Sequence, residues 1–339
     1  MAGPGSLLEG LVWPALDSVA KAPPHLILLA LLALVAPGLL ALYVLLYLLA
    51  PKPRAPLPSE KTYVTSTPDC GRKTAQLPCW YDRWLAEHRR AVAAAAAAGS
   101  SQSDFVDPGN IEPAGVAVTV IVPAYNEEDR ILPTLREMVE YLDANFGRHP
   151  TPTPSPISPG NTILSPRTAH KKRQLIEGVE DVVDGSGRGV AIGSRGHLVG
   201  SEAVVKRSAV RNFLMKSFHF ILMILTPPAT SRIRDTQCGF KLFSRASLPH
   251  IIPYMHCEGW IFDIEMLMLA ESAPATPVLA SDGSVIGASP GIKVAEVPID
   301  WHEVEGSKMS LMKDSINMAI GLAVLRASWM MGVYRRRLT

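Results

Sequence analysis

Apolar residues along this chain fall into one long uniform block and several shorter segments with helical or strand spacing. The block comes first: no charged residue occurs between Ala22 and Pro51, and residues 25–50 are rich in leucine. A helix of about 20 apolar residues is enough to cross the hydrocarbon core of a bilayer. A cleaved signal peptide has a shorter apolar core and a cleavage site of small residues, and buried core helices are rarely so long. We therefore expect a retained transmembrane anchor over 25–50.

Basic residues flank this block unequally. Lys52, Arg54 and Lys61 follow it, whereas Lys21 is the one Lys or Arg that precedes it in the sequence. Positively charged flanks tend to stay in the cytosol. The bias predicts that residues 1–24 form a short lumenal N-terminus and that the bulk of the chain faces the cytosol.

Residues 51–114 are rich in proline and alanine and are predicted to be a juxtamembrane linker. The piece from Cys79 to Gly99 within them favours a helix that ends at the glycine. Its aromatic residues suit either the membrane interface or packing against the folded domain, and the sequence leaves both open. These residues are Trp80, Tyr81 and Trp84.

The folded domain is predicted to cover residues 115–339. Its first segment, Val116 to Val122, is an apolar run short enough for a strand that is buried on both faces. The polar stretch "PAYNEE" follows, and then apolar residues recur at helical spacing between Arg130 and Leu142. A strand, a polar turn and a helix are the opening unit of a nucleotide-binding α/β fold.

A proline-rich stretch without periodicity interrupts this pattern. Residues 146–174 are predicted to be a disordered insert at the surface of the domain. The next regular element is expected at Gly189 to Arg195, where "GVAIGSR" indicates a short strand.

Two later segments are apolar but carry basic residues. Val210 to Leu225 is too short and too charged to span a bilayer, so it suits an amphipathic helix on the membrane surface or, equally, a core helix. Residues 315–337 have an apolar body and a basic end, and Arg326 in the middle favours the membrane surface over a span.

Charge and cysteine content exclude several classes of protein. The formal net charge of +2 over 339 residues is low for a general nucleic-acid binder. The four cysteines form no Cys-x-x-Cys pair, so neither a zinc site nor a disulfide framework is indicated. Reduced thiols in a cytosolic domain are the simplest interpretation.

Taken alone, "PAYNEE" fits an ordinary strand-to-helix loop as well as a nucleotide site. Three later stretches change this interpretation: "DTQCGFKLF" from Asp235, "GWIFDIEML" from Gly259 and "WHEVEGSKMSLMKDS" from Trp301. Together with "GSRGHLVGSEAVVKRSAVRNFL" from Gly193, and in this order, they resemble the dolichyl-phosphate β-glucosyltransferases, which are family 2 glycosyltransferases. The resemblance covers the anchor and most of residues 115–330.

This resemblance implies a GT-A fold, an α/β nucleotide-diphospho-sugar transferase fold, with an N-terminal transmembrane helix and amphipathic membrane-surface helices. It implies transfer of glucose from UDP-glucose to dolichyl phosphate with inversion, giving the lipid-linked glucose used in N-glycan precursor assembly. The expected location is the endoplasmic-reticulum membrane, single-pass, with the catalytic domain in the cytosol.

The acceptor in such a reaction is already anionic at neutral pH, because the second pKa of a phosphate monoester is about 6. The site must therefore overcome repulsion between this nucleophile and a diphosphate leaving group, which calls for cations. The candidates for phosphate binding are Arg195, Arg207, Arg211 and Lys308. By resemblance, Arg195 of "GSR" and Lys308 of "GSK" match positions that contact donor or acceptor phosphate.

The remaining site residues also follow from the resemblance. The first loop of the family contacts the nucleotide at positions that match Pro123, Tyr125 and Glu127. The carboxylates expected near the sugar are Asp235, Asp263 and Glu265. A salt bridge on a helix surface is the alternative for the last two, although their apolar neighbours disfavour a solvated face.

Two family signatures are missing from the chain. One is "VDDGS", whose aspartate contacts the nucleotide, and the other is a "DADGA" type Asp-x-Asp that holds Mg²⁺ or Mn²⁺ on the diphosphate. The stretch "VVDGSGRGV" from Val182 is similar to the first, but it directly precedes "AIGSR" and is assigned to the linker before that strand. We expect that two or three βα units are absent, with the junction near Gln174 and Leu175.

The missing block leaves alternatives open. Loss of central strands and metal-binding carboxylates predicts little or no transferase activity for this chain. A catalytically inactive, membrane-anchored remnant of the enzyme is therefore one alternative. Mannosyl transfer is another, and it is less favoured because His302 stands where the mannosyl relatives place arginine.

Overall fold

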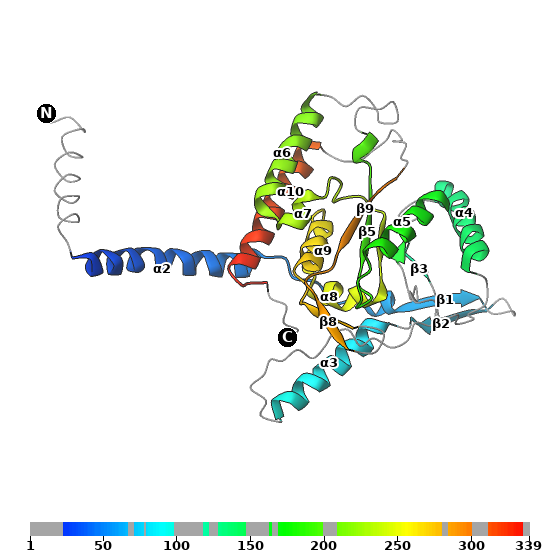
Figure 1. Ribbon diagram of the computed structural model, residues 1–339, viewed down its shortest axis with the longest axis horizontal. Coiled ribbons are helices and arrows are strands. Elements are labelled where there is room, and N and C mark those ends of the chain that lie inside the picture. The colour runs from blue at the N-terminus through cyan, green and yellow to red at the C-terminus, as the bar shows by residue number, and fades with distance from the viewer. Residues whose placement is uncertain are drawn as a thin grey trace. The chain divides into compact units, whose positions relative to one another are not determined.

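The computed structural model describes residues 23–66, 71–77, 79–97, 118–121, 128–146, 163–164, 169–198, 209–279, 284–299 and 311–334. The chain is mixed α/β and divides into two compact units (Figure 1). The first unit comprises Met1–Ala50 with Val324–Arg335, and the second comprises Pro51–Ala323 with Arg336–Thr339.

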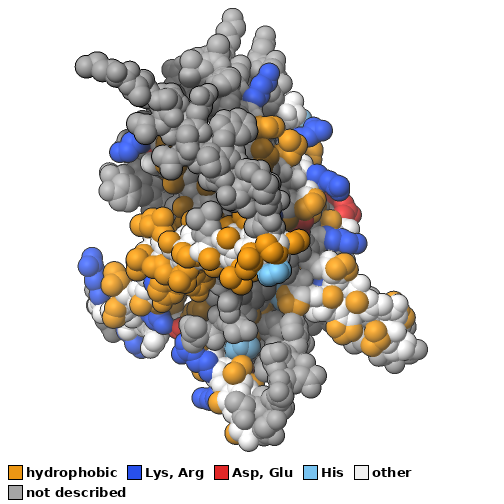
Figure 2. All heavy atoms as spheres, turned by 90° about the vertical axis from the view of Figure 1, so that its left-hand side faces the viewer, with side chains coloured by type: hydrophobic (Ala, Val, Ile, Leu, Met, Phe, Trp, Pro, Cys, Tyr) orange, Lys and Arg blue, Asp and Glu red, His pale blue; other side chains and the backbone are white. Residues whose placement is uncertain are grey.

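The first unit contains α2, Pro24–Leu49, which is 26 residues long and contains no Asp, Glu, Lys or Arg. It is the one helix among the described residues that is long and apolar enough to cross a membrane. Its leucine side chains are largely exposed, for example Leu29 at 66% and Leu48 at 70%. On the face drawn in Figure 2, hydrophobic side chains gather across the middle of the view, and others lie nearer its edges. The predicted apolar helix is therefore confirmed as a candidate membrane span.

The core of the second unit is a three-stranded sheet with the order β6-β5-β9. The central strand β5, Val190–Ser194, is buried along its whole length, as its apolar sequence requires. It pairs in parallel with β9, Val294–Pro298, and antiparallel with β6, Lys241–Phe243. The apolar side chains of this sheet form the centre of the main hydrophobic cluster.

Two helices cover the sheet, on either side of it in Figure 1. On α5, Ala169–Val182, a Cβ added at Gly178 would lie 2.3 Å from Cγ2 of Val297, so a glycine is needed for the close approach of this helix. The helix α9, Phe262–Glu271, is buried at nearly every position. Leu267 of α9 and Val179 of α5 both join the core cluster.

The other helices and strands surround this centre. A short parallel pair joins β3, Thr119–Val120, to β4, Ile163–Leu164, and a hairpin joins β7, Thr276–Leu279, to β8, Val285–Ser289. Further helices are α4 (Glu128–Phe146), α6 (Ala209–Leu225), α7 (Pro228–Arg232), α8 (Leu248–Ile251) and α10 (Leu311–Met330). The 3-10 turns within the described residues are η1 (Pro58–Lys61), η2 (Gly196–Leu198), η3 (Arg245–Ser247) and η4 (Ile252–Tyr254).

The segment predicted to be a juxtamembrane linker is folded where the structure describes it. It contains an antiparallel hairpin, β1 (Thr62–Ser66) with β2 (Arg72–Gln76), and the helix α3, Trp80–Ala97. Trp84 is 5% exposed and stacks with Tyr81 and His88 of the same helix. These residues belong to the second compact unit together with those of the predicted domain, whereas the sequence pattern predicted a separate linker for them.

The prediction that residues 146–174 form a disordered insert is wrong in part. Ile163 and Leu164 form β4, and α5 begins at Ala169. Its apolar positions Leu175, Ile176, Val179 and Val182 have helical spacing, but the prolines upstream obscured where that pattern starts. Residues 147–162 and 165–168 lie outside the described residues.

Candidate functional site

Arg195 and Asp235, both predicted to act in the site, are bound to each other. Arg195 follows β5 directly, and its Nε and Nη2 atoms lie 2.6 and 2.8 Å from the two carboxylate oxygens of Asp235. The backbone N–H of Arg195 donates to the same carboxylate at 3.0 Å. The Arg195 side chain is 36% exposed and that of Asp235 is 12% exposed. Such a two-pronged pair fixes the direction of the guanidinium more firmly than a single contact.

A third carboxylate, Glu296 of β9, holds the backbone of the loop that carries Asp235. Its Oε1 accepts hydrogen bonds from the backbone N–H groups of Arg234 and Asp235 at 3.0 and 3.1 Å. The ends of β5 and β9 and the "DTQCGF" loop are thus joined by hydrogen bonds. Glu296 lies outside the motifs that indicate the family resemblance. Its position identifies it as a site residue, because it belongs to the strand that pairs in parallel with β5 and lies between two core residues, Ala295 and Val297.

Asp263, at the start of α9, is paired with a buried lysine. Its Oδ1 lies 2.6 Å from Nζ of Lys241, and the same Nζ donates to the carbonyl of Cys238 at 2.6 Å. Burial raises the pKa of Asp263, while the charge of Lys241 and its hydrogen bond act in the opposite direction. Asp263 therefore forms a salt bridge in the interior of the protein, and the alternative of a salt bridge on a helix surface is wrong for it.

Glu265 is fully buried at 0% exposure. Its Oε2 accepts the backbone N–H groups of His256 and Cys257 at 2.9 and 2.8 Å, and its Oε1 lies 2.9 Å from Nδ1 of His256. Burial, followed by the charge of Glu265 and a hydrogen bond to it, raises the pKa of the Cys257 thiol. A carboxylate that has no exposed surface and has these partners holds the backbone of a loop in place, and a sugar cannot reach it.

These contacts decide whether the described carboxylates suit a divalent metal. Asp235, Asp263 and Glu265 each have a cation or backbone N–H groups as partners. Across the described ranges, no group of three or more His, Cys, Asp or Glu side chains is placed to hold a metal ion. The residues present in that part of the chain do not fit the Mg²⁺ or Mn²⁺ site expected for the family, and we derive no step through a metal.

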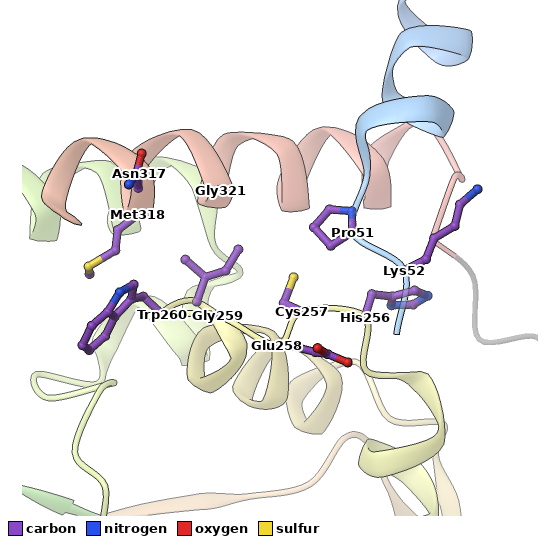
Figure 3. Close-up of a pocket in the computed structure, with 11 residues that line it drawn as sticks. Pro51, Lys52, His256, Cys257, Glu258, Gly259, Trp260, Asn317, Met318 and Gly321 are labelled. Carbon is purple, nitrogen blue, oxygen red and sulfur yellow. The ribbon is translucent and has the colours of Figure 1, made fainter. Parts of the chain in front are cut away.

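A cavity of about 410 Å³ lies next to the "GWIFDIE" segment (Figure 3). Trp260 and Met318 lie at one end, and Pro51, Lys52 and His256 lie at the other. The wall also includes Cys257, Glu258, Gly259, Ile261, Asn317 and Gly321. The cavity is lined mainly by apolar side chains with a few polar groups, which is the usual character of a small-molecule site.

Several predicted site residues cannot be placed in this geometry. The nucleotide-contacting positions Pro123, Tyr125 and Glu127 lie outside the described residues. So do two of the predicted phosphate-binding cations, Arg207 and Lys308, and their roles stay predictions. Arg211 lies in α6, where only the course of the backbone is described.

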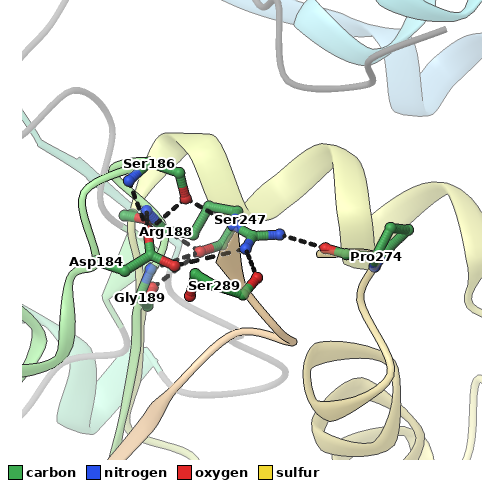
Figure 4. A network of polar contacts seen from close by, with 8 residues as sticks. Asp184, Ser186, Arg188, Gly189, Ser247, Pro274 and Ser289 are labelled. Carbon is green, nitrogen blue, oxygen red and sulfur yellow. Dashed lines mark hydrogen bonds and ion pairs between the residues drawn. The ribbon is translucent and has the colours of Figure 1, made fainter. Parts of the chain in front are cut away.

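The "VVDGSGRGV" stretch forms the turn that enters β5, as expected for a linker (Figure 4). Asp184 accepts hydrogen bonds from Ser186 and from the backbone of Arg188. Arg188 is 1% exposed. Its Nη1 and Nη2 atoms donate to the carbonyls of Pro274 and Ser289, both at 2.9 Å. The partners of this aspartate lie in its own turn and at Ser289 of β8.

The comparisons with known proteins show that the chain is similar to glycosyltransferases, which are enzymes that transfer sugars. No family model matches it. Curated proteins named dolichyl-phosphate beta-glucosyltransferase do match, and the chain is a relative of them. It is 48% identical to the Saccharomyces cerevisiae protein over 43% of this chain and 38% of that protein. It is 35% identical to the Dictyostelium discoideum protein over 50% of this chain and 45% of that protein. These matches confirm the resemblance that the motifs indicated.

The chain spans less than half the length of these two relatives. A longer match, 27% identical, is made to the Drosophila melanogaster dolichyl-phosphate beta-glucosyltransferase and covers 84% of that protein. This alignment runs over 296 residues but includes 69% of the 339 residues here, or about 234, so about 62 alignment positions have no counterpart in this chain. Such a difference is what an absent internal block predicts.

Proposed function

We propose that this chain belongs to an enzyme that transfers glucose from UDP-glucose to dolichyl phosphate with inversion, giving dolichyl β-D-glucosyl phosphate for N-glycan precursor assembly. The observation that carries this proposal is the set of matches to proteins of that name, together with the "GSR" and "DTQCGF" motifs that meet in the structure. The architecture we propose is a GT-A domain that is incomplete in its central part.

The proposed location is the endoplasmic-reticulum membrane, with α2 as a single-pass anchor and the second unit in the cytosol. The length and apolar composition of α2 support an anchor, and the basic residues after it support this orientation. On α6, the side chains of Phe220, Met223 and Ile224 are 59–60% exposed and recur at helical spacing, which suits contact with a membrane surface.

In the proposed reaction, a phosphate oxygen of the acceptor forms a bond to C1 of glucose while the bond from C1 to the β-phosphate oxygen of UDP breaks. UDP leaves with the electron pair of that bond. No general base is needed, because the acceptor oxygen is already ionised at neutral pH. Arg195 supplies positive charge for the phosphate, and Asp235 holds the guanidinium in direction.

A second candidate is a catalytically inactive, membrane-anchored remnant of this enzyme. It is favoured by the absence of "VDDGS" and of any Asp-x-Asp from the sequence, and by the alignment positions without a counterpart. Mannosyl transfer is not favoured, because the relatives we compared are named for glucosyl transfer.

The test compares two chains in membranes that lack other dolichyl-phosphate glucosyltransferases. One is this chain, and the other is a restored chain with the central block of the Saccharomyces cerevisiae relative inserted ahead of Ala169. The insertion avoids the expected junction at Gln174, because α5 runs unbroken through that position. Labelled glucose from UDP-glucose is followed into the lipid fraction, with GDP-mannose as the competing donor.

We expect the restored chain to form glucosyl lipid and this chain to form far less of it. A restored chain without glucose transfer, or one that uses GDP-mannose, would overturn the proposed function. Equal rates from the two chains would overturn the interpretation that an essential block is missing. A restored chain whose inserted Asp-x-Asp is changed to Asn-x-Asn serves as the inactive control.

A further inference from the structure

Glu271, the last residue of α9, holds the start of α7 from a neighbouring helix. Its Oε1 accepts the backbone N–H of Ala229 at 2.9 Å, and its Oε2 accepts the backbone N–H and the hydroxyl of Thr230 at 2.7 and 2.8 Å. The residue before α7 is Pro227, and its side chain makes no capping hydrogen bond. The first N–H groups of a helix need such a partner. Glu271 therefore supplies a cap that the sequence of α7 does not contain.

The same short helix is joined closely to α6. Because α6 ends at Leu225 and α7 begins at Pro228, the corner between them is two residues long. The first of these, Thr226, is buried, and its N–H and its hydroxyl both donate to the carbonyl of Leu222, at 2.9 and 2.7 Å. α7 lies against both α6 and α9 (Figure 1). Packed and hydrogen-bonded elements of this kind carry coupling between distant sites.

The other end of α7 leads directly into the loop that carries Asp235. Ile233, just after α7, is buried in the main hydrophobic cluster. Glu296 accepts two backbone N–H groups of this loop, and Asp235 in turn binds Arg195. Two carboxylates from different elements thus hold α7, Glu271 at its start and Glu296 just beyond its end. α7 is therefore a short, fixed connection between α6 and the Arg195–Asp235 pair.

The outer face of α6 at its end is apolar. Phe220, Met223 and Ile224 are exposed, whereas Leu222 among them is buried. Contact of such a face with water is unfavourable, and burial in a membrane surface removes it. A helix whose apolar face is buried in this way is held in one position.

We infer that Glu271 is a positioning residue for the Arg195–Asp235 pair, because it ties α7 to the core and so couples the contact of α6 with a membrane to the order of the "DTQCGF" loop. The membrane contact of α6 and the role of Arg195 rest on the proposed function. When α6 lies on a membrane, the fluctuations of α6 and α7 are reduced, and the loop that holds Asp235 against Arg195 is ordered with them. The guanidinium is then best aligned at the surface where a lipid-linked acceptor is found.

Hydrogen exchange in lipid nanodiscs tests this coupling on the full chain. The exchange of the backbone amides over 233–238 is followed by mass spectrometry. One variant carries Phe220→Ser and Ile224→Ser, which remove the apolar face of α6. Its matched control carries Val285→Ser and Ile286→Ser, which change two exposed apolar side chains of β8. All of these chains keep α2 and are reconstituted in the same way.

We expect the α6 variant to exchange at least about fivefold faster than the wild type over 233–238, and the β8 control to exchange at the wild-type rate. Equal rates for the α6 variant and the wild type would overturn the inference. The amides over 264–269, in the buried helix α9, report on the fold and should keep their rates. Faster exchange that extends to them would also overturn the inference, since the change would then loosen the whole core.

Glu271 is tested by combining its substitution with the α6 changes. Glu271→Ala removes the cap and should by itself speed exchange over 233–238, and the α6 changes should then add little. Such non-additivity is the sign of coupling through this residue. A merely structural role predicts that the two effects add, so additive effects would overturn the inference.

A conservative variant covers the case in which Glu271→Ala fails to fold. Glu271→Gln keeps one acceptor oxygen for Thr230, so it should reduce the difference between chains with and without the apolar face of α6 but not abolish it. An undiminished difference in Glu271→Gln would overturn the inference.

A separate measurement tells a failure of this inference from a failure of the proposed function. Phe220→p-benzoylphenylalanine keeps the aromatic ring, and its light-induced crosslinks to phospholipid show whether α6 lies on the membrane. Crosslinks to lipid together with equal loop exchange overturn the inference alone. Absence of crosslinks overturns the membrane contact of α6 in the proposed function, and the inference with it. Neither measurement needs glucose transfer, so an inactive chain is judged by the same outcomes.

Discussion

Two arginines at the two ends of β5 illustrate how position decides the use of one residue type. Arg188 precedes the strand and is 1% exposed, and Arg195 follows it with a side chain that is 36% exposed. Arg188 donates to the backbone carbonyls of Pro274 and Ser289, which are distant in the chain, whereas Arg195 is bound by the carboxylate of Asp235. A guanidinium whose donors end on carbonyls in the interior stabilises the fold. One that a carboxylate aims at the surface is suited to bind an anion.

The same contrast separates the three predicted catalytic carboxylates. Asp263 and Glu265 lie in the interior with partners that leave no surface for a sugar. Asp235 lies near the surface, but its carboxylate is occupied by Arg195. We therefore expect all three to position other groups, and the following changes test the comparison between the two ends of the strand.

The largest effect is expected from Arg188→Met. The change leaves the carbonyls of Pro274 and Ser289 without their buried donors and removes the ion pair with Asp184, which should lower the free energy of unfolding by about 3–5 kcal/mol. Pulse proteolysis in urea, carried out on the chain in detergent, measures this free energy of unfolding. Arg232→Met, at an exposed arginine, is the control and should change it by less than about 0.5 kcal/mol. A loss below about 1 kcal/mol for Arg188→Met would mean that the network does not stabilise the fold.

Asp184→Asn should have a smaller effect that depends on pH. Burial disfavours the ionised carboxylate, but hydrogen bonds from Ser186, Ser289 and the backbone of the turn outweigh it, so the pKa of Asp184 is lowered from its ordinary value of 3.8. Its contribution to stability is therefore present above pH 3.8 and is lost as the pH falls through the lowered value.

The free energies of unfolding of the wild-type chain and of the Asp184→Asn variant are compared from neutral pH downward. The difference in stability between wild type and Asp184→Asn should be about 1–2 kcal/mol near neutral pH and should vanish in acid. A difference that grows as the pH falls would show the opposite sign of the shift and contradict this account.

Arg195→Met should change stability by about 1 kcal/mol at most, because the side chain is partly exposed to solvent. Glucose transfer by the restored chain should fall at least tenfold, since the change removes the charge that we propose faces the acceptor phosphate. Arg195→Lys keeps the charge but not the fork of donors, so an intermediate rate is expected. An unchanged rate for Arg195→Met would remove Arg195 from the site.

The smallest effect is expected from Glu296→Gln. Its remaining carbonyl oxygen still accepts the two backbone N–H groups, so stability should change by less than about 1 kcal/mol and transfer by the restored chain should fall only two- to threefold. Glu296→Ala removes the acceptor and should reduce transfer further. If both variants transfer at the wild-type rate, Glu296 does not position the loop for function.

Much of the local structure followed from the sequence by itself, because it depends on the spacing of apolar residues within one segment. The apolar block predicted α2, the helical spacing between Arg130 and Leu142 predicted α4, and the apolar run before "GSR" predicted β5. The start of α5 was missed where prolines masked its pattern, and the hairpin of β1 and β2 was missed because its residues are polar and exposed.

The motifs also determined which residue types gather near the site, but the tertiary structure alone decided their partners. Arg195 and Asp235 are 40 positions apart in the chain, and Lys241 and Asp263 are 22 apart. Ion pairs over such separations form only when the sheet and α9 bring the groups together, and they have no periodic signal in the sequence. For the same reason the cavity between α10 and the "GWIFDIE" segment emerged only from the fold.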